Sequence, residues 1–450
     1  MSEDCRLRIL FVIGSMGGGG AERQMLEILW RLDRARFKPF LYLAMKQGEL
    51  LSEVPPDVPI FAFWDQQPES WSRRFFRTFK LTRLLRYRHL ADVLRREKID
   101  LIYDRTYLAT LDAAGGCWFR PTPRISCCVA DPQPELEQHA RFSISLARKM
   151  ARRAYLSASI VLANSEGLRH RVLEYFKLPP EHVSVYSNLL ACVRQQVSVA
   201  SLEALAGEDR SSSRSNLPLT TVNVPQNTEN HDVTGLEINR ERHERLLSFC
   251  TENKGTFLIV SAGRLHPQKG YQFLLEAINE VVRDRGRSAV RLALFGQGES
   301  EAELQSYLQK QHLEQHVLLA GFDPDPRRWY PHARLFVLPS LSDAMPNALI
   351  EAVVDGIPAL ATTCPTGPKE ILAEGQLGGL VPPGDASALA EAIVDAMDHY
   401  DRWKERALVA RDRVHRMFDP ETGMQRLQVL MEQIVRGHKL PPMPLERDER

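Results

Sequence analysis

The chain has 450 residues, which is too many for one typical hydrophobic core, so two or three domains are expected. Its hydrophobic content of 44% and charged content of 26% are ordinary for a globular protein. The net charge of +1 argues against a partner such as nucleic acid that binds through bulk charge. The seven cysteines are scattered without a CxxC pair, which favours reduced thiols and a cytoplasmic location over disulfides or a zinc site.

The chain opens with an apolar run, RILFVIG, that predicts a buried parallel strand from Arg8 to Gly14. The glycine loop SMGGGG follows it, and AERQMLEILWRLD then has the spacing of an amphipathic helix. The run is too short to cross a membrane and no small-residue cleavage site follows it. Strand, loop and helix therefore predict the start of a βαβ unit rather than a signal peptide.

The rest of the first half alternates in the same way. Strands are predicted at residues 37–45, 58–64, 98–105 and 123–130, with a basic helical region from Ser72 to Lys98. Residues 157–188 close the half as strand, helix and strand. This order predicts a doubly wound α/β domain over residues 1–188. Residues 207–232 are rich in Ser, Asn, Thr and charge, which predicts a linker over residues 189–254 with a largely disordered insertion.

Strands and helices resume in residues 255–410, which predicts a second α/β domain. The stretch Asp385-Ala386-Ser387 could cap a helix there. A last helix, entered at Pro420, is predicted within residues 411–436, and a flexible tail within residues 437–450. Two α/β halves of this kind commonly enclose a ligand cleft.

Glycines and polar residues follow four predicted strands of the second half. Because the carboxyl ends of parallel strands share one edge of a sheet, these loops should converge on one rim. The residues are Gly263, Arg264, Lys269 and Gly270 after the first strand, Gly296, Gln297 and Gly298 after the second, Gly321 and Phe322 after the third, and SDAMPNALIEA after the fourth.

Two of these loops have charges that suit a phosphate ligand. In SAGRLHPQKGY, Arg264 could hold a diphosphate by a forked pair and Lys269 by a point charge; the alternative is two solvated surface cations. In SDAMPNALIEA, a helix N-terminus near Met345 to Asn347 suits a leaving phosphate, and Asp343 and Glu351 suit sugar and ribose hydroxyls. The alternative is that Asp343 caps the helix and Glu351 is an ordinary first-turn acid.

The motifs GRLHPQKGY, LFGQGE, ARLFVLPSLSDAMPNALIEAVVDGIPALAT and GPKEIL, in this order and spacing, resemble the donor half of retaining GT-B glycosyltransferases of family 4. MGGGGAERQMLEILWRL and NSEGLRHRVLEYFKLPPEHVSVYSN are similar to parts of the acceptor half. The resemblance covers nearly the whole chain outside the insertion and tail. It implies two Rossmann-like domains that face each other across a cleft, with the last helix packing back toward the first domain.

The resemblance also implies a function in polysaccharide or glycolipid biosynthesis. A hexosyltransferase would move a sugar, with retention, from a nucleotide-diphosphate sugar to a glycan, lipid-linked or envelope-type acceptor. No metal or other cofactor would be needed, because cations and a helix N-terminus stabilise the departing diphosphate. The implied catalytic residues are Asp343, Asp131, Lys269 and Arg264. The implied donor-binding residues are Gly263, Arg264, Lys269, Gly296, Gly298, Gly321, Phe322, Asp343, Met345, Pro346, Asn347, Ala348 and Glu351, and Gly17, Gly18, Gly19 and Gly20 form the cleft loop.

The chain departs from the family pattern in three places. Asp343 stands where the first acid of the E-x7-E motif is usually Glu, and Glu351 is the second acid. Asp131 is expected to take the place of a histidine common in a first-half loop. The Asn-Pro pair common after the last strand of the first half is also missing. These departures motivate an alternative function, a catalytically weak or inactive nucleotide-sugar-binding protein. The loop MGGGGAE does not match G-x-G-x-x-G, which argues against a dinucleotide oxidoreductase.

The segment from Arg73 to Arg96 mixes arginines with Phe, Leu and Tyr. Basic amphipathic segments bind anionic membrane surfaces, which predicts peripheral contact at the inner face of a membrane. The alternative is a solvated helix face with snorkelling arginines.

Overall fold

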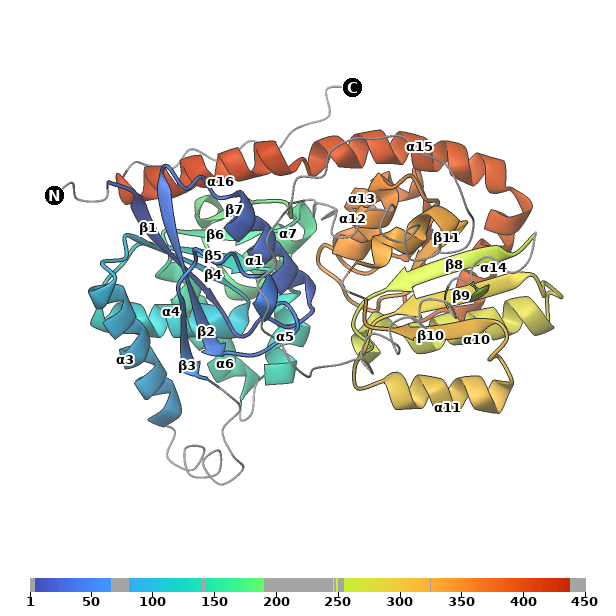
Figure 1. Cartoon of the computed structure of the whole chain (residues 1–450), viewed down its shortest axis with the longest axis horizontal. Coiled ribbons are helices and arrows are strands. Elements are labelled where there is room, and N and C mark those ends of the chain that lie inside the picture. Colours follow the sequence, from blue (N-terminus) through green and yellow to red (C-terminus); the bar gives the residue numbers. More distant parts are fainter. Residues whose placement is uncertain are drawn as a thin grey trace, which may run out of the picture. The chain divides into compact units, whose positions relative to one another are not determined.

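The structure, a computed structural model, describes residues 5–65, 81–139, 143–189, 246, 248–249, 255–323 and 325–437 (Figure 1). By their internal contacts, the described residues up to 189 and those from 255 onward form one compact unit. Most of the predicted linker and insertion, the tail beyond residue 437 and residues 73–80 of the basic segment lie outside the described residues. Within the described ranges, no helix is both long and apolar enough to cross a membrane.

The first half is built on a seven-stranded parallel sheet with the order β3-β2-β1-β4-β5-β6-β7. The strand order reverses direction next to β1, which creates the switch point where doubly wound sheets bind ligands. The strands are β1 (Leu7–Ile13), β2 (Phe37–Met45), β3 (Ile60–Trp64), β4 (Leu101–Arg105), β5 (Arg124–Cys128), β6 (Ile160–Ala163) and β7 (Val183–Val185).

Helices cover both faces of this sheet, so the inner strand β1 is apolar and buried from Ile9 to Ile13. Alternate side chains point to opposite faces: Phe11 packs in a core with α1 and with α16 (Pro420–Val435), whereas Val12 packs in a core with α3 and α4. The helices are α1 (Gly20–Arg31), α3 (Leu81–Arg96), α4 (Tyr107–Phe119), α5 (Pro132–His139), α6 (Ile144–Leu156) and α7 (Glu166–Phe176), with short turns η1 (Leu51–Glu53) and η2 (Pro180–His182).

The second half has a six-stranded parallel sheet with the order β10-β9-β8-β11-β12-β13. The strands are β8 (Phe257–Ala262), β9 (Val290–Phe295), β10 (Val317–Gly321), β11 (Leu335–Leu338), β12 (Ala359–Thr362) and β13 (Gly379–Val381). The helices are α10 (Tyr271–Arg283), α11 (Glu301–Gln311), α12 (Asn347–Val354), α13 (Pro368–Ile371) and α14 (Ala386–Asp398), with turns η3 (Pro267–Lys269), η4 (Pro326–His332) and η5 (Ala373–Gly375). Asp385 caps α14 as predicted, because its side chain accepts a hydrogen bond from the Ala388 N–H. The prediction of two parallel-sheet α/β halves is confirmed.

Two consecutive helices end the described chain, α15 (Tyr400–Met417) and α16 (Pro420–Val435). The predicted boundary after residue 410 is wrong because it falls inside α15, which contains neither Gly nor Pro. The helix breaks instead at Phe418, and Asp419 caps α16 by accepting a hydrogen bond of 2.8 Å from the Thr422 N–H.

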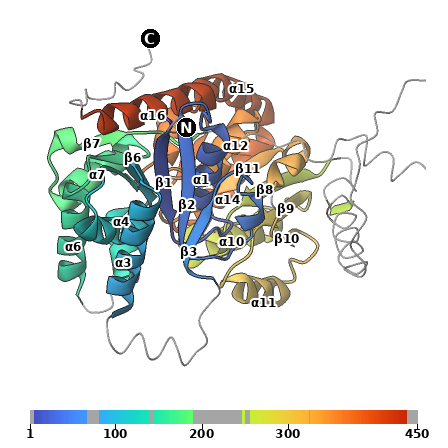
Figure 2. The same cartoon turned by 60° about the vertical axis from the view of Figure 1, so that its left-hand side comes forward.

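The α16 helix packs on the first half, and α15 lies against α12 of the second (Figures 1 and 2). Leu427 and Met431 of α16 join the core cluster that contains Phe11 of β1. A hydrogen bond also holds α16 against the first half, because Gln428 Oε1 accepts from the Asp33 N–H over 2.8 Å. Helix α16 is therefore part of the first half's core.

Candidate functional site

A cleft of about 690 Å³ is lined by loops that follow strands in both sheets. This is the position at which open parallel α/β sheets bind ligands. The predicted site residues that line it are Gly17, Gly18, Gly19, Gly20, Asp131, Gly263, Arg264, Lys269, Gly296, Gly298, Phe322, Asp343, Met345, Pro346, Asn347, Ala348 and Glu351. Gly321 is not among the lining residues; its carbonyl accepts a hydrogen bond of 2.8 Å from the Gly296 N–H and so supports the neighbouring loop.

Asp343 and Lys269 form an ion pair in the wall made by the second half. Lys269 Nζ lies 2.5 Å from Asp343 Oδ2, and the Ser340 hydroxyl donates to the same oxygen over 3.2 Å. Lys269 is therefore not a free surface cation. The alternative in which Asp343 caps a helix is wrong, because the N-cap of α12 is Pro346 and no side chain caps that helix. Asp343 is held in the cleft wall by a charge and a hydroxyl instead.

Glu351 is the fifth residue of α12, so it lies beyond the first turn, which contains no acid. The alternative of an ordinary first-turn acid is therefore wrong. The side chain lines the cleft, yet the residue is only 8% exposed. Burial raises the pKa of its carboxyl to about 7, against the opposing charges of Arg23 and Arg327. A buried acid that titrates near neutral pH beside a cleft is a typical feature of a functional site.

Arg264 lines the same cleft but is exposed, so the alternative of a solvated cation stays open for it. Across the cleft, burial raises the pKa of the Glu22 carboxyl, and the charges of Arg264 and Arg105 partly oppose this rise. The cleft is thus bordered by cations from both halves. This pattern suits a ligand with several negative charges.

The glycine loop Gly17–Gly20 leads into α1, whose N-terminus has no side-chain cap and therefore offers free N–H groups. A side chain at Gly18 would place its Cβ 2.8 Å from the ring of Phe322, so the small residue lets the two loops meet. Gly296 has a φ of 144°, and a Cβ there would lie 1.9 Å from the carbonyl oxygen of Gly263. The absence of a side chain thus lets Gly18 approach the ring of Phe322, and lets Gly296 approach the backbone of Gly263, at the rim of the cleft.

Asp131 lines the cleft and is buried, but its carboxylate already has partners in the first half. Arg171 Nη2 lies 2.7 Å from Asp131 Oδ2, and the Gln133 N–H donates to Oδ1 over 3.3 Å. A catalytic role for Asp131 stays a prediction, and these contacts on their own favour a role in holding the start of α5.

The sequence interpretation missed several polar residues of the first half that line the cleft. Three of them are Arg105, Asn164 and Asn188. Each follows or ends a strand, so the carboxyl-end rule that was applied to the second half would have found them. Arg105 Nη2 donates to Asn188 Oδ1 over 2.8 Å, and Asn188 Nδ2 donates to Asn347 Oδ1 over 2.7 Å. Asn347 Nδ2 in turn donates to the Gly20 carbonyl over 3.2 Å, so a chain of hydrogen bonds joins β4 to the start of α12 and to the glycine loop.

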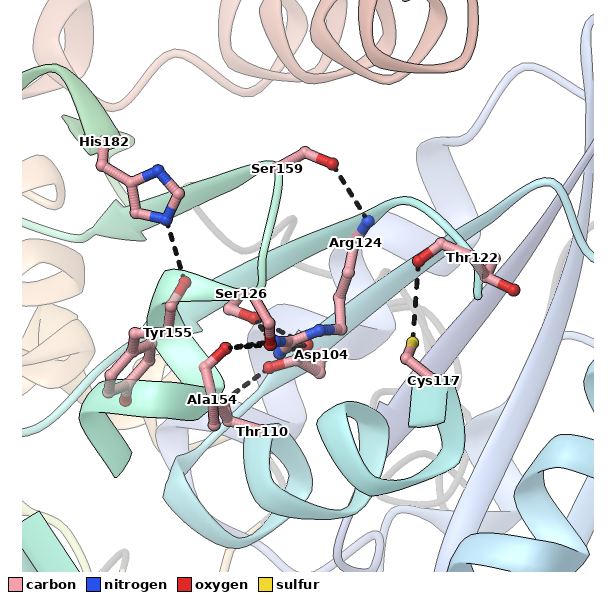
Figure 3. Close-up of polar contacts among 11 residues, drawn as sticks. Asp104, Thr110, Cys117, Thr122, Arg124, Ser126, Ala154, Tyr155, Ser159 and His182 are labelled. Carbon is pink, nitrogen blue, oxygen red and sulfur yellow. Dashed lines mark hydrogen bonds and ion pairs between the residues drawn. The ribbon is translucent and has the colours of Figure 1, made fainter. Parts of the chain in front are cut away.

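A buried ion pair between neighbouring strands, β4 and β5, fixes the end of β4 (Figure 3). Arg124 Nη1 lies 3.0 Å from Asp104 Oδ2, and the hydroxyls of Ser126 and Thr110 donate to the same carboxylate over 2.8 and 2.5 Å. Both charged side chains are almost fully buried. Because Asp104 immediately precedes Arg105, this network holds the backbone from which Arg105 reaches the cleft.

Within the part of the chain that the structure describes, no three His, Cys, Asp or Glu side chains gather in a way that could hold a metal ion.

Two parallel-sheet α/β halves with a cleft between their strand ends define the GT-B class of fold, as expected from the sequence. HepE of Anabaena, solved in complex with UDP-glucose, has this fold: the TM-score is 0.69 at 20% identity, covering 95% of this chain and 100% of that one. Two family models match the chain, Glycosyltransferase Family 4 over residues 18–190 and Glycosyl transferases group 1 over residues 256–399. The chain belongs to the group 1, family 4 glycosyltransferases.

Curated relatives match over shorter segments. The chain is 29% identical over 184 residues to the amylovoran biosynthesis glycosyltransferase AmsK of Erwinia amylovora, covering 39% of this chain and 44% of that one. It is 35% identical over 119 residues to an uncharacterized glycosyltransferase of Methanocaldococcus jannaschii, covering 26% and 29%. The matched segments thus span less than half the length of either curated relative.

Proposed function

We propose that the protein is a retaining hexosyltransferase that moves a sugar from a nucleotide-diphosphate sugar to a glycan, lipid-linked or envelope-type acceptor. The observation that carries the proposal is the composition of one cleft wall: the Lys269–Asp343 ion pair, the start of α12 and the buried Glu351. These are the groups that a nucleotide-diphosphate sugar needs, namely a cation, free N–H donors and carboxylates for hydroxyls.

Each group has a separate task in the proposed reaction. Lys269, Arg264 and the N-terminus of α12 stabilise the charge that develops on the departing diphosphate. Glu351 accepts hydrogen bonds from the ribose hydroxyls, and Asp343, fixed by Lys269, accepts one from the donor sugar. The acceptor enters from the first half, beside the glycine loop. This electrostatic scheme requires no metal ion.

Family membership and the UDP-glucose complex of HepE support the donor class. AmsK is named for amylovoran biosynthesis, which supports a polysaccharide or related acceptor. The test is a thermal-shift screen against nucleotide sugars, because a ligand that binds the native state raises apparent stability. The donor that binds is then incubated with candidate acceptors in EDTA, and the anomeric configuration of the product is determined by NMR. Inversion would refute the retaining mechanism, and binding without any transfer would indicate an inactive binding protein.

We also propose that the first half contacts an anionic membrane surface peripherally, at the inner face of the cytoplasmic membrane. Trp118 at the end of α4 is 75% exposed, and Leu84, Leu85 and Phe119 are also exposed. The guanidinium of Arg88 lies 5.7 Å from the ring centroid of Phe119, so apolar and basic groups share this surface. Vesicles with anionic lipid should float the protein in a salt-sensitive way, and Trp118→Ala should weaken this. Equal flotation with neutral and anionic vesicles would contradict the proposal.

A further inference from the structure

Arg105 is a buried cation whose side-chain hydrogen bonds go to neutral groups. It is only 3% exposed, and its guanidinium donates to two neutral groups, Asn188 Oδ1 at 2.8 Å and the Tyr103 hydroxyl at 3.3 Å. Its Nε has no hydrogen-bond partner, and no carboxylate among the described residues forms an ion pair with it. An unpaired buried charge is costly, so its presence at a cleft points to a ligand that pairs with it.

Asn164, in contrast, has a buried acceptor atom that lacks a donor. It is 5% exposed and lines the same cleft, yet its Oδ1 has no hydrogen-bond partner. A buried carbonyl oxygen of this kind requires a donor such as a hydroxyl. One orphaned donor group and one orphaned acceptor atom therefore border the cleft within the first half.

Strand register places these two residues on one face of the sheet. Arg105 of β4 pairs with Cys127 of β5, and Cys127 pairs with Leu162 of β6. Paired residues of parallel strands point to the same face, and Asn164, two residues after Leu162, continues that face. With only β5 between them, β4 and β6 lie about 10 Å apart, a span that one hexose with an anionic substituent can bridge.

We propose that Arg105 and Asn164 form an acceptor subsite that binds a sugar carrying an oxyanion, either a phosphate or a carboxylate, with a hydroxyl donating to Asn164. The term acceptor rests on the proposed glycosyltransferase function; the oxyanion subsite itself does not. The donor-side cations, Arg264 and Lys269, follow a strand of the second sheet, whereas both subsite residues come from the first.

Glu22 does not remove the need for such a ligand. It feels the positive charge of Arg105, but burial is the largest effect on its carboxyl and raises its pKa. Arg105 is also rigidly placed, because the buried Asp104–Arg124 pair holds the preceding residue (Figure 3). A rigid, buried and unpaired guanidinium is pre-organised for an anion.

The test measures melting temperatures of the full chain, saturated with UDP, with glucose 6-phosphate, glucuronate or neutral glucose as probes. The wild type should respond to the two anionic sugars at about 20 mM with a rise of about 2 °C or more and not respond to glucose. Arg105→Gln should abolish this response while changing the UDP affinity less than about threefold. Arg264→Gln is the matched control: it should weaken UDP at least about tenfold and keep the response to anionic sugars.

A second variant keeps the proposal testable if Arg105→Gln fails to fold. Asn164→Asp removes the amide and puts a second negative charge on the wall of the subsite, so repulsion should abolish the response to the anionic sugars. If Arg105→Gln weakens UDP at least about tenfold instead, Arg105 binds the donor diphosphate and the acceptor assignment is overturned. An anion response that survives in both variants, or is absent from the wild type, also overturns it.

These outcomes separate the subsite from the proposed function. UDP binding and sugar transfer without any anion response would leave the glycosyltransferase proposal intact and refute the subsite. An anion response that depends on Arg105, in a protein that transfers no sugar, would support the subsite and refute the glycosyltransferase proposal.

Discussion

Glu351→Gln should stabilise the protein while it damages nucleotide binding. Burial raises the pKa of this carboxyl from its ordinary value of 4.5 to about 7. The folded state therefore holds the proton more tightly than the unfolded state. Stability is highest below the unfolded pKa, falls as the pH rises from 4.5 to about 7, and is constant above that. The shift corresponds to about 3 kcal/mol at pH 8.

The glutamine removes this cost because it is neutral at every pH. At pH 8 the variant should be more stable than the wild type by up to about 3 kcal/mol, and at pH 5 by less than about 1 kcal/mol. Thermal or urea unfolding across this pH range measures the difference. Glu303→Gln, an exposed acid on α11, is the control and should show no pH-dependent gain.

The same substitution should weaken UDP at pH 8 by about 10-fold to 100-fold, because hydrogen bonds to a charged acceptor contribute about 1.5–3 kcal/mol. Isothermal titration calorimetry measures this loss. A variant that is less stable than the wild type at pH 8 would refute the reasoning, since it would show that Glu351 is ionised and well paired in the folded state. Unchanged UDP affinity would remove Glu351 from the ribose site.

Three further substitutions test the cleft wall. Lys269→Met should lower kcat by about 100-fold or more, because it removes a cation from the departing diphosphate and frees Asp343; an unchanged kcat would contradict this role. Asp343→Glu should keep more kcat/KM than Asp343→Asn, since only the first retains the charge that pairs with Lys269; the reverse order would count against the ion pair. Gly296→Ala should cost about 3 kcal/mol or more, because its Cβ would clash with the Gly263 carbonyl; Gly286→Ala, also at positive φ but in open space, should cost less in thermal unfolding.

The two sheets could be predicted from the sequence because their signals are local. The apolar run that became β1 and the glycines that follow it specify a buried parallel strand and a tight rim loop. The signals that predict the helix starts at Asp385 and Pro420 are also local, because a capping residue or a proline affects only the first turn of its own helix. The boundary predicted after residue 410 was wrong because no helix-breaking residue lies near it, so α15 continues through that position.

The tertiary structure decided what the charged residues do. A helix cap stayed an alternative for Asp343 until the fold brought Lys269, 74 positions earlier in the chain, to within 2.5 Å of it. Glu351 became a group that titrates near pH 7 only because packing buries it. The places of Arg105 and Asn164 at strand ends can be predicted from the sequence, but their missing hydrogen-bond partners are a property of the assembled sheet. Charge and spacing are local, whereas burial and pairing depend on residues far away in the chain.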